Sequence, residues 1–139
     1  MSGPSGDARS ELDARVNAIE EAYEFFLAYA SQGLPSDQGS GSGAQIRDYL
    51  QRCDGALNGL GSCIMRFVQQ RGMESTPYRA FVNVIDRDAL DASAGIQLVL
   101  AQAAIGSQLI DNLNASIHLR ALLTDLFLVD EALKSAGRA

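Results

Sequence analysis

The sequence predicts an all-α protein, a helical bundle of four main helices with a long C-terminal helical segment, which pairs as a dimer. Apolar residues recur at alternating spacings of three and four along most of the 139-residue chain, as they do on one face of an amphipathic helix. No stretch alternates with the period of two that a strand requires, and threonine, a common strand residue, occurs only twice. A chain of this length fits one domain.

The predicted domain spans residues 10–136 and follows a disordered tail at residues 1–9, which are rich in Gly, Pro and Ser. Residues 36–43 (SDQGSGSG) have the composition of a flexible linker. We therefore expect one helical domain that is interrupted once by a mobile connection.

The first helix is predicted from an apolar stripe between Leu12 and Ala30. Ser10 precedes the stripe and is the expected N-cap, because a serine hydroxyl can accept a hydrogen bond from a free amide of the first turn. Gly33 is expected to end the helix, and Pro35 follows it.

The second helix is predicted over residues 44–71, with Gly72 at its end. Three glycines lie inside it, at positions 55, 59 and 61. Each interior glycine lowers helix stability by about 1 kcal/mol relative to alanine. We expect neighbouring helices to pack closely against all three glycines and so to offset this loss.

A short helix is expected over residues 77–85, with Thr76 as its N-cap and Pro77 in its first turn. The aspartates at positions 86, 88 and 91 then mark a bend or a new start. One unbroken helix over residues 91–135 would be about 68 Å long, roughly twice the length of the first helix. Either the chain breaks near residues 111–114, or a second subunit covers the excess length.

The long C-terminal segment carries apolar residues on more than one face, so it needs cover on several sides. We expect a second copy of the chain to supply part of that cover. The predicted dimer interface consists of Ile96, Val99, Ala103, Gly106, Ile110, Leu113 and Ile117.

Charge and cysteine usage narrow the choice of partners and compartment. The net charge is −6, which argues against nucleic acid and anionic membranes as partners. The polar N-terminus lacks an apolar core, and no stretch is apolar enough to span a bilayer. Cys53 and Cys63 lie about 15 Å apart if one helix carries both, too far for a disulfide. We therefore expect reduced thiols and a cytoplasmic location.

Catalytic motifs are sparse. The sequence has neither a nucleophile elbow nor the paired Glu-x-x-His motifs of a di-iron bundle, and its one histidine, His118, lies on a helical stripe with acidic residues. Cys63 lies near Arg66, which could favour a reactive thiolate. We expect no catalytic residues, no metal and no cofactor. The predicted function is that of a non-catalytic protein–protein interaction module, acting as a homodimer with a further protein partner.

The alternative is a small-molecule-binding or sensor bundle. Its apolar pocket would lie beside the glycine-rich face of the second helix, where small side chains leave room for a ligand. The candidate ligand-binding residues are Gly55, Gly59, Cys63, Tyr49, Tyr78 and His118.

Overall fold

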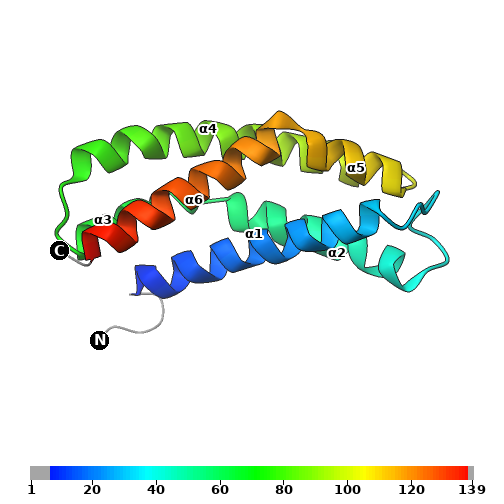
Figure 1. Cartoon of the computed structure of the whole chain (residues 1–139), viewed down its shortest axis with the longest axis horizontal. Coiled ribbons are helices and arrows are strands. Elements are labelled where there is room, and N and C mark those ends of the chain that lie inside the picture. The colour runs from blue at the N-terminus through cyan, green and yellow to red at the C-terminus, as the bar shows by residue number, and fades with distance from the viewer. Residues whose placement is uncertain (1–6, 138–139) are drawn as a thin grey trace.

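The computed structural model describes residues 7–137, which form six α-helices and no strand (Figure 1). The all-α prediction is therefore confirmed for this part of the chain. The helices are α1 (Ala8–Ala30), α2 (Gly41–Leu57), α3 (Leu60–Gln70), α4 (Ser75–Leu100), α5 (Ser107–Ala115) and α6 (Ile117–Gly137).

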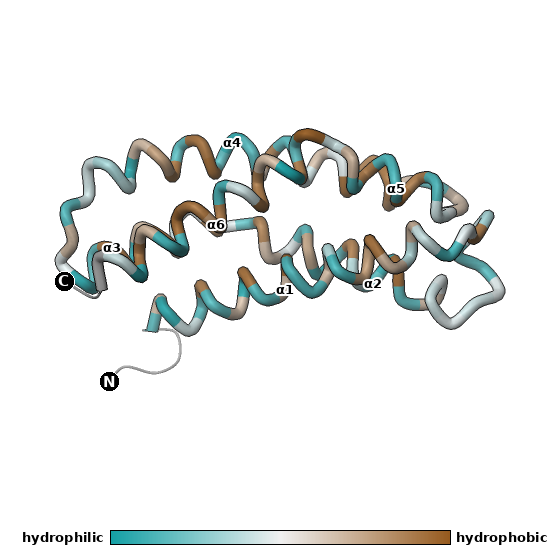
Figure 2. Tube along the Cα trace, viewed as in Figure 1, coloured by the Kyte–Doolittle hydropathy of each residue, from teal (hydrophilic) through white to brown (hydrophobic). Residues whose placement is uncertain are grey.

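Two long helices organise the molecule. The α1 helix packs against α2, α3 and α5, while α4 packs against α2, α3, α5 and α6. The molecule is elongated, and α1 begins at the same end at which α6 finishes (Figure 1). Apolar residues recur along every helix (Figure 2). All six helices contribute fully buried side chains to one core, among them Ile19, Leu50, Ile64, Ile96, Ile110 and Leu122.

The N-cap of α1 is Asp7, so the prediction of Ser10 was wrong. The Asp7 carboxylate accepts hydrogen bonds from the amides of Arg9 at 3.0 Å and Ser10 at 3.4 Å. The Ser10 hydroxyl itself donates to Asp7 at 2.8 Å, so it supports the cap from inside the helix. Residues 7–9 thus belong to the start of the helix rather than to the expected tail, whose other residues, 1–6, lie outside the described part.

The predicted helix over residues 44–71 is in fact two helices. It begins earlier, because Ser40 caps α2 by accepting from the amide of Gly43 at 2.9 Å, within the expected linker. It also breaks at Asn58 and Gly59. Asn58 is extended, and Gly59 has a φ of +87°, which glycine adopts without the cost of a side chain.

An arginine from α1 stabilises this break. The Arg15 side chain donates from Nη1 to the carbonyl oxygen of Ala56 at 3.1 Å and also to that of Asn58. These carbonyls lack helical partners because α2 ends there. The Arg15 Nε also pairs with Glu11 at 3.0 Å. A contact distant in sequence therefore fixes the end of α2.

Only one of the three glycines is packed as expected. A side chain at Gly61 would lie 2.2 Å from Asp86 Oδ1 and 2.9 Å from Val82 Cγ1, both on α4. Gly59 forms the turn described above. A side chain at Gly55 would meet nothing within 4 Å, so the expectation of close packing at Gly55 was wrong.

The region after residue 75 folds differently from the prediction. The α4 helix is continuous over 26 residues, so no separate helix covers 77–85 and no bend follows at the aspartates. Its N-cap is Glu74, whose carboxylate accepts from the amide of Thr76 at 3.3 Å. The chain then reverses at residues 101–106 and breaks again at Ser116, rather than at 111–114. The reversal lays α5 and α6 back along α4, which removes the problem of excess length.

The reversal is held by Arg47 of α2. Its guanidinium donates to the carbonyl oxygens of Leu100 at 3.0 Å and Gln102 at 2.8 Å, at the C-terminal end of α4. Arg47 also pairs with Asp37 at 2.9 Å, and Asp37 accepts from the amide of Ile105 at 2.8 Å. The loop before α2 is thereby tied to the loop after α4.

A second set of bonds joins the same two loops. The Tyr29 hydroxyl donates to the carbonyl oxygen of Ile105 at 2.6 Å. Ser107 and Leu34 exchange two hydrogen bonds of 2.8 Å, one through the amide of Ser107 and one through its hydroxyl. These hydrogen bonds therefore hold the loop that follows α1 against the loop that follows α4.

The reversal also changes the surroundings of the predicted dimer interface. Ala103 is exposed, Ile117 is 72% exposed, and a side chain at Gly106 would meet the carbonyl oxygens of Leu34 and Pro35 at 2.9 and 2.8 Å. The other four residues of that set are buried by the chain's own helices: Ile96, Val99, Ile110 and Leu113.

Candidate functional site

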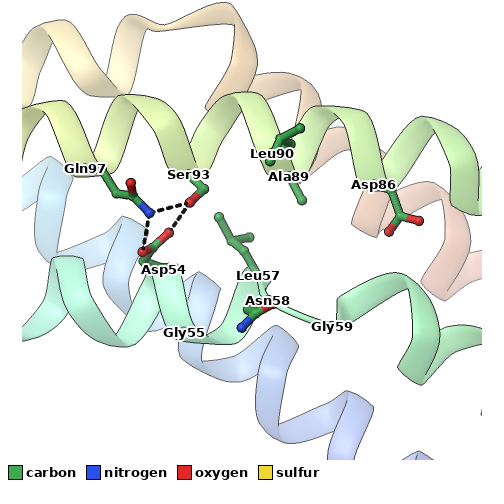
Figure 3. A pocket seen from close by; sticks show the side chains of 10 residues that line it. All are labelled: Asp54, Gly55, Leu57, Asn58, Gly59, Asp86, Ala89, Leu90, Ser93 and Gln97. Atoms are coloured by element: carbon green, nitrogen blue, oxygen red, sulfur yellow. Dashed lines mark hydrogen bonds between the residues drawn. The ribbon is translucent and has the colours of Figure 1, made fainter.

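A hollow with a volume of about 540 Å³ lies between the α2–α3 turn and α4 (Figure 3). That volume is within the range of sites for small molecules. The residues that line it are Asp54, Gly55, Leu57, Asn58, Gly59, Asp86, Ala89, Leu90, Ser93 and Gln97.

One wall of this cavity is a hydrogen-bonded carboxylate. Asp54 on α2 accepts from the Ser93 hydroxyl and, at 3.3 Å, from the Gln97 amide, both on α4 (Figure 3). Ser93 and Gln97 also bond to each other at 3.3 Å, because residues four apart lie on the same helical face. These bonds hold Asp54 in place and connect α2 to α4.

The remaining lining combines charge with apolar surface. Asp86 lies at the far end of the cavity, against Gly61. Leu57 and Ala89 are buried, whereas Leu90 is 71% exposed at the rim. Two carboxylates beside an apolar floor suit a cationic group attached to a short apolar body.

Two of the six predicted ligand-binding residues, Gly55 and Gly59, line this cavity. Cys63 does not, because it is buried, and its thiol lies 3.6 Å from the carbonyl oxygen of Ala8. Burial, with Glu11 nearby, raises the pKa of Cys63, which favours the unreactive thiol. Burial raises the pKa of Cys53 to about 12.

The other three predicted residues lie elsewhere. Tyr49 stacks on Phe25 with ring centroids 4.3 Å apart. Tyr78 is half-buried against the core. His118 is exposed on α6, with its Nδ1 3.8 Å from a carboxylate oxygen of Asp91 on α4.

Sequence reasoning missed the polar residues of the cavity. Asp86, Ser93 and Gln97 are separated by seven and four residues, so they share one face of α4, and this polar stripe was available as a signal. Their relation to Asp54 could not be predicted, because it depends on which helices pack together.

A second hollow, of about 460 Å³, is a groove between α1 and α6. Its apolar residues are the half-buried Tyr23, the buried Leu123 and Phe127, which is 60% exposed. The rim on α1 carries Glu20 and Glu24, and the rim on α6 carries Arg120 with Thr124. We call this feature, Glu20, Tyr23, Glu24, Arg120, Leu123, Thr124 and Phe127, the α1–α6 groove.

The charged groups on the two rims remain available to a partner. Within residues 7–137, Arg120 forms no ion pair with Glu20 or Glu24. Opposite charges therefore face solvent on either side of an aromatic residue that is itself largely exposed.

No group of three or more His, Cys, Asp or Glu side chains between residues 7 and 137 is arranged to hold a metal ion. None of the helices described combines the length and the apolar character needed to cross a bilayer.

No known family model matches this chain, and neither does any curated protein or solved structure.

Proposed function

We propose that this chain is a non-catalytic protein–protein interaction module of the cytoplasm, an adaptor, assembly factor or regulatory subunit that acts as a helical homodimer. The α1–α6 groove is the proposed dimer interface. We also take α2 with α3, and α5 with α6, as two interrupted members of a four-helix bundle. The observation that carries the proposal is the exposure of Phe127 beside the buried Leu123.

An exposed phenylalanine favours association. Burying such a side chain contributes about 1.5–3 kcal/mol relative to leaving it in water. Aromatic residues seated in grooves are also typical centres of interface energy. Phe127 lies in a groove with Tyr23 and Leu123, so a partner that covers it gains contacts with three apolar side chains.

The charges on the rims favour a second copy as the occupant. In a two-fold interface, each subunit presents the same surface to the other. Arg120 of one copy then faces Glu20 and Glu24 of the other, and the reverse contact forms at the same time. The charges of the groove are therefore complementary to those of a second, identical groove. A surface that binds a different protein does not require this property.

The oligomeric mass tests this interface. We expect the wild-type chain to sediment as a dimer at high concentration, and Phe127→Asp to sediment as a monomer because it places a charge in the buried centre. Leu98→Asp is the matched control, since Leu98 is 66% exposed on α4 and lies outside the groove. Circular dichroism of both variants verifies that the helices remain folded.

Two results would contradict the proposal. One is a wild-type chain that stays monomeric over the whole concentration range. The other is a dimer that survives Phe127→Asp and dissociates with Leu98→Asp.

The cavity of about 540 Å³ between α2 and α4 favours a second candidate function, the binding of a small cationic ligand. Gly55 provides a clean test, because it lines the cavity and a side chain there meets nothing within 4 Å. Gly55→Leu should fill the cavity without disturbing the fold, whereas Gly55→Ala should leave most of it open.

Hexylamine, with hexanoate as its anionic counterpart, is a suitable pair of probes. The second candidate predicts that hexylamine raises the melting temperature of the wild-type chain and of Gly55→Ala, but not of Gly55→Leu. Equal effects of the two probes, or equal effects on all three chains, would refute a specific cationic site.

A further inference from the structure

The contact between α4 and α6 contains several titratable groups. The α6 helix packs against α4 and α5. Asp88 and Asp91 of α4 face this contact, and so do His118 and Asp125 of α6. We call these four residues the α4–α6 seam.

Asp125 has an unsatisfied carboxylate within the seam. Its Oδ2 atom is buried and receives no hydrogen bond from any described residue. Burial, together with the neighbouring carboxyl group of Asp88, raises the pKa of Asp125 to about 7. A shared proton would let one of the two carboxyl groups donate to the other, as in other close carboxyl pairs.

Among the described residues, Asp88 is the one charged group that shifts the pKa of Asp125, and no cation offsets it. The one charged residue of α5 is Asp111, which is exposed. Arg87, which precedes Asp88 on α4, is exposed. On α6, Arg120 lines the α1–α6 groove and Lys134 pairs with Asp130 at 3.0 Å. Two ionised carboxylates in the seam therefore repel each other.

A second pair of side chains spans the seam. His118 Nδ1 on α6 lies 3.8 Å from Asp91 Oδ2 on α4. This contact places α6 against α4 beside the carboxyl pair of Asp88 and Asp125. A proton taken up by that carboxyl pair removes the repulsion between the two groups.

The turn before α6 contains a buried polar side chain without a hydrogen-bond partner, which favours local opening there. Asn114, in the last turn of α5, is 7% exposed, and both polar atoms of its amide are buried without a hydrogen-bond partner. A buried unpaired amide costs free energy that local opening recovers. The opening would occur next to the start of α6.

We propose that the α4–α6 seam is a pH-sensitive clamp, which holds α6 against α4 in acid and loosens it as the pH rises. The clamp operates within one chain, so it goes beyond the proposed dimer and does not depend on it. Loosening α6 would also displace one wall of the α1–α6 groove.

Hydrogen exchange, expressed as protection factors, tests the clamp. We expect the protection of α6 relative to that of α1 to fall roughly tenfold or more between mildly acidic and mildly alkaline pH. Asp125→Asn, which removes the second charge, should preserve the protection of α6 at alkaline pH. The matched control is Asp130→Asn, the same change on the same helix but outside the seam, and it should behave as the wild type does. Protection of α1 in the same sample reports global unfolding and any dissociation of a dimer.

Asp88→Asn provides a second variant, since it removes the repulsion from the side of α4. It should give the same result as Asp125→Asn. The clamp is refuted if α6 and α1 lose protection in parallel in the wild-type chain. It is equally refuted if both asparagine variants lose the protection of α6 at alkaline pH as the wild type does.

Discussion

Gly55 and Gly61 show how differently two glycines of one segment can be used. Gly61 allows α3 to approach Val82 and Asp86 of α4, whereas Gly55 faces open space on α2. Both were predicted to be packed, because a sequence shows that glycine is small but not which surface lies beside it. At the scale of single residues, the sequence therefore shows where the small residues are, but not which of them packs against a neighbouring helix.

Alanine substitutions separate the two glycines. Gly55→Ala should raise the free energy of unfolding by up to about 1 kcal/mol, because it improves helix propensity without a clash. Gly61→Ala should lower it by about 1 kcal/mol or more, because Val82 is buried and cannot move away freely. Urea denaturation measures both. Stabilisation by Gly61→Ala would contradict the close packing of α3 on α4.

The helices themselves follow from local sequence patterns, since each apolar stripe predicts a helix wherever it occurs. The end of α3 shows this well, because Gly72 has a φ of +63° just after the last turn, as predicted. The ends of α2 and α4 were missed. Arg15 fixes one of them and Arg47 the other, and each arginine lies on a different helix from the end that it stabilises.

Arg47→Met tests whether these distant contacts define the elements. It should destabilise the protein by about 1–3 kcal/mol, because the carbonyl oxygens at the end of α4 lose a charged donor. Arg52→Met is the matched control, since Arg52 lies on the same helix but contacts only side chains of that helix, as an exposed ion pair with Asp48 and over the ring of Tyr49. It should change stability little. Equal urea midpoints for the two variants would show that Arg47 is not needed to end α4.

At the scale of the whole molecule, ionisable groups act on stability in two opposite directions. Hydrogen bonds from Arg66 and Arg15 lower the pKa of Glu11, and the amide of Ile105, with Arg47, lowers the pKa of Asp37. Stability from these two groups is present above about pH 4 and lost below it. The raised pKa of Asp125 has the reverse effect, so its stabilising contribution is lost as the pH rises through about 4 to 7.

The two effects together predict that stability is greatest in mildly acidic solution. The free energy of unfolding, measured by urea denaturation across the pH range, should fall on both sides of a maximum at about pH 5. Asp125→Asn should flatten the alkaline side and leave the acidic side unchanged. A stability that rises steadily from pH 5 to pH 8 in the wild-type chain would contradict this assignment.

The candidate sites were only partly predictable for a related reason. Gly55 and Gly59 pointed to the cavity beside α2, because small residues are visible in a sequence. The α1–α6 groove was not foreseen, since it depends on the reversal at residues 101–106, which brings α6 back beside α1. The same reversal buries four residues of the predicted interface in the core of the chain, whereas Phe127 stays exposed.

Mixing two charge-reversed chains tests the proposed dimer most directly. Arg120→Glu places like charges on the two sides of the interface, and the double variant Glu20→Arg with Glu24→Arg does the same with the opposite sign. Each chain alone should therefore sediment as a monomer. In the mixture every rim contact again joins opposite charges, so we predict a heterodimer with the summed mass. Two chains that remain monomeric after mixing, or variants that still dimerise alone, would contradict the α1–α6 groove as the interface.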